Sequence, residues 1–202
     1  MEFVYVVKRY DLFDLEFPHG FHAVTESNLL STYLERIKQR GFFIERRFCE
    51  TDSGFKQVIP YSIVAHDNRI LLLKRTTSQG ESRLHNKASI GVGGHINPVD
   101  DAEDVLFNGC RREIEEELEI EEAYEPVPVG TINDESNAVG SVHFGIVYLI
   151  KLESGRVKVR ETSMMSAEFV DVDRLKQLAD QEDSNIESWS SLIIRSFDAL
   201  PL

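Results

Sequence analysis

Apolar residues recur along the chain in two kinds of pattern. Short apolar runs bounded by turn residues predict strands at residues 3–7, 58–65, 70–74, 88–90, 128–133, 142–151, 156–160 and 167–170. Apolar residues at helical spacing predict helices at about 29–37, 101–118, after Asp171 and at 186–197. Because strands and helices are interleaved, the pattern predicts a mixed α/β fold.

Three local features refine these elements. Pro60 has no backbone N–H, which predicts an edge position or a strand start within the hairpin formed by 58–65 and 70–74. Ser184 and Glu187 have the spacing of a capping box, which predicts the beginning of the last helix. The helix expected from Asp101 carries acids in its first turn, where the helix dipole favours them.

The pattern changes near residue 57 and divides the chain into two parts. Residues 1–56 indicate a small α/β extension with no catalytic motif, and residues 57–202 indicate the main domain. The aromatic side chains of Phe42, Phe43 and Phe48 are candidates to pack this extension on the main domain or on a second subunit, which makes a homodimer a hypothesis.

Composition and charge then narrow the class of protein. The 202 residues, 42% of them hydrophobic and 28% charged, are typical of a globular protein and exclude collagen-like, disordered and disulfide-scaffold classes. The net charge is −13, and the segment 100–122 alone contributes −9, from eleven acids against Arg111 and Arg112. A negative net charge argues against general nucleic-acid binding, because proteins bind polyanions through Lys and Arg. Carboxylates at such density must face water, cap a helix or bind cations.

The cysteines and the N-terminus predict a cytoplasmic protein. Cys49 and Cys110 stand 61 positions apart, which supports neither a disulfide framework nor a zinc site. The apolar run at residues 1–7 is too short for a signal peptide, and no stretch approaches the roughly 18 apolar residues of a membrane span.

The acids of the helix at 101–118 form two sets on a helical wheel. An apolar stripe is expected from Leu106, Cys110, Ile114 and Leu118. Glu113, Glu116 and Glu117 flank this stripe, whereas Glu115 and Glu119 point toward solvent. Three carboxylates beside a buried face repel one another, and a divalent cation would remove the conflict; the alternative is an ordinary solvated face.

A glycine segment, Gly91-Val92-Gly93-Gly94, precedes this helix. It lets the backbone approach an anion or a metal. It is neither GxGxxG nor a P-loop, so it does not support binding of a dinucleotide or of a P-loop nucleotide.

Loop and helix together resemble the Nudix box of the Nudix hydrolases. That pattern is G, five residues, E, seven residues, R-E-apolar-x-E-E-x-G-apolar, and the residues that match it are Gly94, Asp104, the run Arg-Glu-Ile-Glu-Glu-Glu at 112–117, and Ile120. The sequence departs from this pattern at three points. Nine residues instead of five separate Gly94 from Asp104, and Asp104 replaces a glutamate. Glu119 replaces the glycine near the end of the helix, so the helix either ends without that glycine or continues to about Ile120. The resemblance covers about 58–170 and implies a Nudix-like α/β/α sandwich with a mixed sheet, to which residues 1–56 are added.

The resemblance also implies a function and a site. It implies a MutT-like pyrophosphohydrolase that uses Mg²⁺ or Mn²⁺ and a metal-activated water on a nucleoside diphosphate linked to another group, with nucleic acid entering only as a capped or terminal substrate. The implied metal ligands are Glu113, Glu116, Glu117 and the Gly93 carbonyl. The implied catalytic residues are Glu116, Glu117, Arg112 to orient the glutamates, and Glu161 as a remote general base, with Glu117 as the base within the box. Candidates to meet substrate phosphates are Lys74, Arg75, Arg83 and Lys87.

Several alternatives remain open. Isopentenyl diphosphate isomerases share this fold, and Gly94-His95 resembles their Gly-His step, but Gly93 stands where they carry a reactive cysteine. A noncatalytic nucleotide sensor is the other alternative. Three histidines, His85, His95 and His143, are ligands by type or structural residues. Phe144 and Tyr148 stack a base or pack in the core. The substrate, the general base and the oligomeric state are not determined by the sequence.

Overall fold

A computed structural model describes the whole chain except residues 15, 26–27, 76–86, 164 and 182–183. The strands are β1 (Phe3–Lys8), β2 (Gly20–Ala23), β3 (Phe42–Glu45), β4 (Phe55–His66), β5 (Arg69–Arg75), β6 (Ala88–Ser89), β7 (Gly91–Gly93), β8 (Leu118–Ile120), β9 (Val127–Asn133), β10 (His143–Lys151), β11 (Val157–Val159) and β12 (Met165–Asp171). The helices are α1 (Arg9–Leu12), α2 (Leu29–Arg40), α3 (Val105–Glu117), α4 (Ala138–Ser141), α5 (Val172–Ala179) and α6 (Ser188–Ile194), with 3₁₀ turns η1 (Arg46–Phe48), η3 (Pro98–Asp100) and η4 (Phe197–Ala199).

One mixed sheet forms the centre of the molecule. Its main path is β12-β5-β4-β10-β9-β2, in which β10 pairs with β4 in parallel and the other neighbours are antiparallel. Strand β10 has seven consecutive buried residues, because both of its edges are paired and both faces of the sheet are covered by helices. A separate two-stranded sheet joins β8 and β11.

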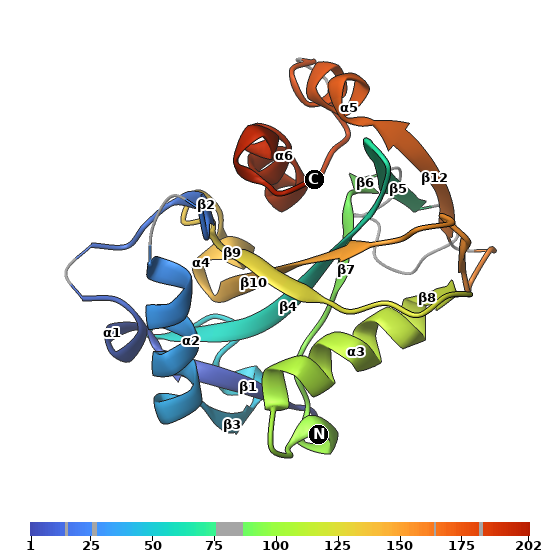
Figure 1. Cartoon of the computed structure of the whole chain (residues 1–202). Helices are drawn as coiled ribbons and strands as arrows, with labels where there is room; N and C mark the ends of the chain where they lie inside the picture. Colours follow the sequence, from blue (N-terminus) through green and yellow to red (C-terminus); the bar gives the residue numbers. More distant parts are fainter. Residues whose placement is uncertain (15, 26–27, 76–86, 164, 182–183) are drawn as a thin grey trace.

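Helices cover both faces of the sheet (Figure 1). Apolar side chains of α2 and α3 belong to the hydrophobic core on one face, and those of α5 and α6 belong to the core on the other. This is the α/β/α arrangement expected from the sequence. The described helices include none that is long and apolar enough to cross a membrane.

The N-terminal segment takes part in the same sheet. Strand β1 pairs with β3 and with the start of β4, and β2 extends the far edge by pairing with β9. A third core cluster, under η1, contains Val4, Val6 and Cys49. The first 56 residues therefore share a continuous sheet with the rest of the chain.

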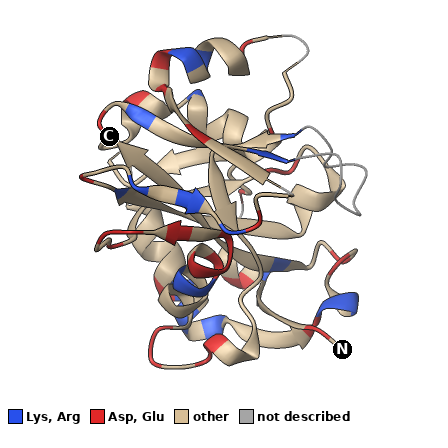
Figure 2. Ribbon diagram, turned by 90° about the vertical axis from the view of Figure 1, so that its right-hand side faces the viewer, with Lys and Arg blue, Asp and Glu red and all other residues tan. Residues whose placement is uncertain are grey.

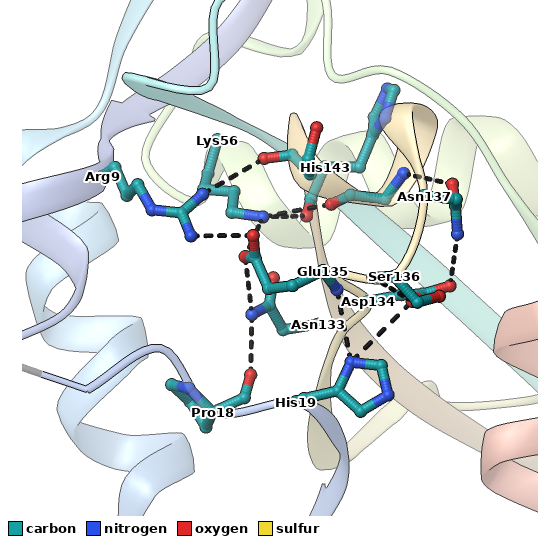
Figure 3. A network of polar contacts seen from close by, with 12 residues as sticks. Arg9, Pro18, His19, Lys56, Asn133, Asp134, Glu135, Ser136, Asn137 and His143 are labelled. Carbon is teal, nitrogen blue, oxygen red and sulfur yellow. Dashed lines mark hydrogen bonds and ion pairs between the residues drawn. The ribbon is translucent and has the colours of Figure 1, made fainter.

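A buried polar network fastens this segment to the loop before β10 (Figure 3). Lys56, fully buried, contacts the Glu135 carboxylate at 2.7 Å and donates to the carbonyls of Gly140 and His143. Arg9 pairs with the other oxygen of Glu135, also at 2.7 Å. Burial lowers the pKa of Lys56 to about 8, and the same burial makes its single carboxylate partner necessary.

Pro60 lies inside a central strand, so the prediction of an edge or a strand start was wrong. On one side β4 pairs continuously with β10. On the other side β1 pairs up to Gln57 and β7 pairs only from Tyr61. Pro60 falls between these two partners, where no ladder hydrogen bond needs its missing N–H.

The carboxylate helix is shorter at both ends than the sequence predicts. Its first residue is Val105, because the side chain of Asp104 caps the helix by accepting a hydrogen bond from the Phe107 N–H. It ends at Glu117, where the backbone becomes extended at Leu118 and continues into β8. Glu119 is thus a strand residue, and no left-handed glycine is needed to stop the helix.

The last helix differs from the prediction in the same way. It covers Ser188–Ile194 and is followed by the separate turn η4. Its N-cap residue, Glu187, makes no side-chain capping bond, so the predicted capping box with Ser184 is absent. The Glu187 carboxylate is therefore free of a capping role.

Candidate functional site

Arg112 is the organising residue of the carboxylate helix. Its Nε and Nη2 atoms donate to the two carboxylate oxygens of Asp100, both at 2.9 Å, and Nη2 also donates to the His95 carbonyl at 2.8 Å. Its Nη1 atom donates to Glu113 at 2.7 Å and to Glu116 at 3.1 Å. These bonds raise the pKa of Arg112, and its guanidinium contacts two glutamates of the helix at once.

The acid that holds Arg112 is Asp100 and not Asp104. Asp100 follows Gly94 after five residues, which is the spacing of the motif, so the four additional residues lie between Asp100 and the helix. Its side chain is buried and also accepts the backbone N–H of Asn97 at 2.9 Å, whereas Asp104 caps α3. The alignment of Asp104 with the first acid of the motif was wrong, and counting from Gly94 would have found Asp100.

Glu113 lies against the glycine segment. A Cβ atom at Gly94 would meet the Glu113 Oε2 atom at 2.3 Å, so any other residue at this position would displace the Glu113 carboxylate. The Glu113 side chain is 13% exposed, and its burial raises its pKa. At Gly93 a Cβ would meet the Pro60 carbonyl at 2.4 Å, which explains the second glycine.

Glu117 is a half-buried carboxylate without a hydrogen-bond donor among the described residues. Burial raises its pKa to about 7, Arg75 opposes the rise, and the nearby carboxylates Glu113, Glu187 and Glu116 add to it. Among the glutamates of the helix it is the one whose negative charge is least compensated.

Glu187 faces the same region from the other side and was missed by sequence reasoning. The segment before α6 pairs with β6, through Ala88 N–H to the Asn185 carbonyl and Glu187 N–H to the Ala88 carbonyl, both at 2.9 Å. Burial raises the pKa of Glu187, while Arg75, Lys87 and a hydrogen bond from Ser89 oppose the rise. The capping pattern concealed this position, and no other local signal marks it.

The glutamates suit a divalent cation by charge and by burial. Acidic residues concentrate on the last turns of α3 and continue into β8 (Figure 2). In the described part of the chain no three His, Cys, Asp or Glu side chains converge as they stand, since Arg112 lies between Glu113 and Glu116. Glu113 and Glu117 are nevertheless half-buried carboxylates with raised pKa values, and such oxygen donors are what Mg²⁺ and Mn²⁺ prefer; Glu116, 59% exposed, lies at the margin.

The described basic residues expected to contact phosphate differ in their acidic partners. Arg75 interacts electrostatically with both Glu117 and Glu187, and Lys87 interacts with Glu187. The Lys74 ammonium is paired with Glu168 at the surface. Arg83, like His85, lies outside the described residues.

The remaining candidates lie in an exposed turn, in the core or beside the N-terminal segment, and the N–H of Arg160, next to Glu161 in the chain, donates to the Glu117 carbonyl at 2.9 Å. Glu161 is exposed, in the turn before β12. Cys110 is buried in α3, and burial raises the pKa of its thiol to about 12. Phe144 and Tyr148 are core residues, 0% and 4% exposed, so neither is available to stack on a base. His95 and His143 lie side by side, with their Nε2 atoms 3.3 Å apart.

Comparison with known proteins gives consistent matches. The family model described as "NUDIX domain" matches residues 57–190. Protein YmaB of Bacillus subtilis (strain 168) is 35% identical over 199 residues, 96% of each chain. The crystal structure of Tm1382, named as a candidate Nudix hydrolase, is similar with a TM-score of 0.78 at 29% identity and covers 97% of this chain and 98% of that one. DR0079 from Deinococcus radiodurans, at 15% identity and a TM-score of 0.53 over 69% of this chain and 81% of that one, shares the fold. The matches to YmaB and to Tm1382 cover 96% and 97% of this chain, so they include the N-terminal segment.

Proposed function

This chain belongs to the Nudix family, as a hydrolase of phosphoric anhydrides, and on that premise we propose that it cleaves the pyrophosphate bond of a nucleoside diphosphate linked to a second group in a reaction that requires Mg²⁺ or Mn²⁺. One observation carries the proposal: Arg112 holds two glutamates of α3 in place while Glu117 beside them keeps an undercompensated charge. A cluster of glutamates repels a polyanionic substrate, so it needs a cation to accept one.

The proposed ligands of the cation are Glu113, Glu116, Glu117 and the Gly93 carbonyl. When bound, the cation supplies charge neutralisation for the phosphates and lowers the pKa of water. Arg112 and Asp100 maintain the geometry, because the two-pronged contact between them fixes the guanidinium that orients the glutamates.

Arg75 and Lys87 are the proposed phosphate contacts. Both lie close to the acidic residues of the site, where a substrate phosphate would offer them an anionic partner. The burial that raises the pKa of Glu117 also excludes water, which strengthens such contacts. Lys74 and Arg83 stay candidates, the first in competition with Glu168.

A carboxylate has to accept the proton of the attacking water, and three candidates differ in position. Glu117 is the base within the helix, Glu161 is the remote candidate expected from the sequence, and Glu187 is the remote candidate that the structure adds. We favour Glu187, because it is half-buried and faces Glu117 across the site, whereas Glu161 is exposed. Burial raises the pKa of Glu187, and a raised carboxylate pKa suits proton transfer at physiological pH.

The proposal is tested with a substrate panel of nucleoside di- and triphosphates, nucleotide sugars, dinucleotides and capped RNA. Products should form only with Mg²⁺ or Mn²⁺, and Glu116→Gln or Glu117→Gln should lower kcat by at least a hundredfold, because each removes one charge from the cation site. Glu115→Gln is the matched control, since Glu115 is on the same helix but is 55% exposed and pairs with Arg111. Full activity in EDTA, or in both site variants, would refute the proposal.

The remote base is tested separately by the pH dependence of kcat. Glu187→Gln should remove the acidic limb of the profile and lower kcat about 10²–10⁴-fold, the usual contribution of a general base. Glu161→Gln should leave the profile unchanged. The opposite pattern would assign the role to Glu161, and an unchanged profile in both would leave Glu117 as the base.

A further inference from the structure

His95 and His143 form a pair of metal-ligating side chains away from the glutamates. His95 follows the glycine segment and His143 begins β10, yet their Nε2 atoms face each other at 3.3 Å. The backbone carbonyl of His95 bonds Arg112, while its ring turns toward the N-terminal segment. The pair therefore lies on the other side of the glycine segment from the carboxylate helix.

The tautomer of His143 is fixed by its surroundings. Its Nδ1 atom is 2.7 Å from the Val139 carbonyl, which only accepts hydrogen bonds, so Nδ1 carries the proton. The Nε2 atom of the neutral ring then presents its lone pair to His95. Metal-binding histidines commonly have this arrangement, in which the second ring nitrogen donates to a carbonyl.

The separation of the two nitrogens matches a tetrahedral metal site. Two Zn–N bonds of about 2.05 Å at the tetrahedral angle hold their nitrogen atoms roughly 3.3–3.4 Å apart. The observed 3.3 Å equals this separation, and the ring centroids lie 5.5 Å apart, so a small tilt of the rings would direct both nitrogens at one ion.

An independent observation is the amide of Gln57. Gln57 is fully buried, and both its Oε1 and its Nε2 atom lack a hydrogen-bond partner. It is the register partner of His143 in the parallel β4–β10 pair, so the two side chains leave the sheet on the same face from adjacent strands. A buried amide without partners costs about 1–3 kcal/mol, and a neighbouring ligand would remove that cost.

The approach to the pair is acidic. An open cleft of about 390 Å³ is lined by Glu2, Glu45, Arg46, Arg47 and Glu50. Glu2 has an oxygen 4.0 Å from the His95 Nδ1 atom, and Arg46 is paired with both Glu2 and Glu50. With three carboxylates and two guanidinium groups, the cleft has a formal charge of −1, and the positive charge of Arg46 acts on the His95 ring against the carboxylates of Glu2 and Glu50.

We propose that His95 and His143 bind a borderline transition-metal ion of the Zn²⁺ class through their Nε2 atoms, with the Gln57 amide oxygen and water completing the coordination. Imidazole selects Zn²⁺, Ni²⁺ or Co²⁺ over Mg²⁺, so this site and the glutamates take different ions. The bound ion would join β4, β10 and the loop that follows the glycine segment.

The test measures bound Zn²⁺ per chain by equilibrium dialysis at pH 7.5 in excess Mg²⁺. Wild type, Glu116→Gln and the matched control His66→Gln should each retain one tightly bound Zn²⁺. His66 also places Nδ1 against a carbonyl, that of Leu152 at 3.0 Å, but contacts no second imidazole among the described residues. His95→Gln and His143→Gln should bind at least tenfold more weakly. Unchanged binding in both, or binding lost in Glu116→Gln, would overturn the proposal.

A measurement on the unmutated protein removes any dependence on the folding of the variants. One equivalent of Zn²⁺ should shift the ¹⁵N resonances of both Nε2 atoms together, and the shift should saturate at that equivalent. Unchanged Nε2 resonances would overturn the proposal, as would a shift in only one ring. The outcome is independent of the hydrolase assay, because neither readout involves turnover.

Discussion

Glu117→Gln should stabilise the protein in the absence of divalent cations even though it abolishes turnover. The folded chain holds a carboxylate whose pKa burial has raised from 4.5 to about 7. Between these two pH values the folded state keeps a proton that the unfolded state has released. The free energy of unfolding therefore falls as the pH rises through this window, and the full cost is present above pH 7.

The magnitude follows from the two pKa values. At about 1.36 kcal/mol for each pH unit, the difference corresponds to roughly 3 kcal/mol, and solvent screening of a half-buried group reduces it to about 2–3 kcal/mol. Glutamine has nearly the same shape and no charge, so the variant avoids this cost.

The assay is urea denaturation in EDTA at pH 5 and pH 8. Glu117→Gln should exceed wild type by about 2–3 kcal/mol at pH 8 and by far less at pH 5, where the wild-type carboxylate is protonated in the folded state. Glu115→Gln, which changes an exposed helix residue paired with Arg111, should differ by no more than about 0.5 kcal/mol at either pH. A variant less stable than wild type at pH 8, or an equal gain at both pH values, would refute the electrostatic reasoning. Saturating Mg²⁺ should stabilise wild type more than the variant.

Two further pairs of substitutions separate roles that the sequence does not distinguish. Asp100→Asn should lower kcat about 10–100-fold, because it weakens the contact that holds Arg112. Asp104→Ala should leave kcat unchanged and lower the free energy of unfolding by about 1 kcal/mol, because it removes the helix cap. Equal losses of kcat in the two variants would contradict this assignment. Glu135→Gln should cost about 3–5 kcal/mol in chemical denaturation, because it leaves the Lys56 ammonium buried without its carboxylate, and Lys56→Met should cost less. A smaller loss for Glu135→Gln than for Lys56→Met would show that the ion pair is not what holds this loop.

The sequence determined the elements that depend on local pattern. The i, i+3, i+4 spacing placed Cys110 and Ile114 in the core and Glu113 and Glu117 on its flank, because a helix that packs on a sheet has one apolar side. The run Arg-Glu-Ile-Glu-Glu-Glu identified the family by itself, since its spacing is set within one helix. The strands 70–74 and 142–151 were recognisable because buried strands are continuously apolar.

The tertiary structure decided what depends on contacts between distant segments. Pro60 is tolerated in a central strand only because its two partners on one side, β1 and β7, leave a gap there. Asp100 rather than Asp104 holds Arg112, because the η3 turn, and not the helix, brings a carboxylate to the guanidinium. Glu187 enters the site because the chain before α6 pairs with β6, about a hundred residues away in sequence. Residues close in the sequence determine which side of a helix or strand is apolar. The charged partners of a side chain come from distant segments and are known only in the folded chain. The candidate site depends on both.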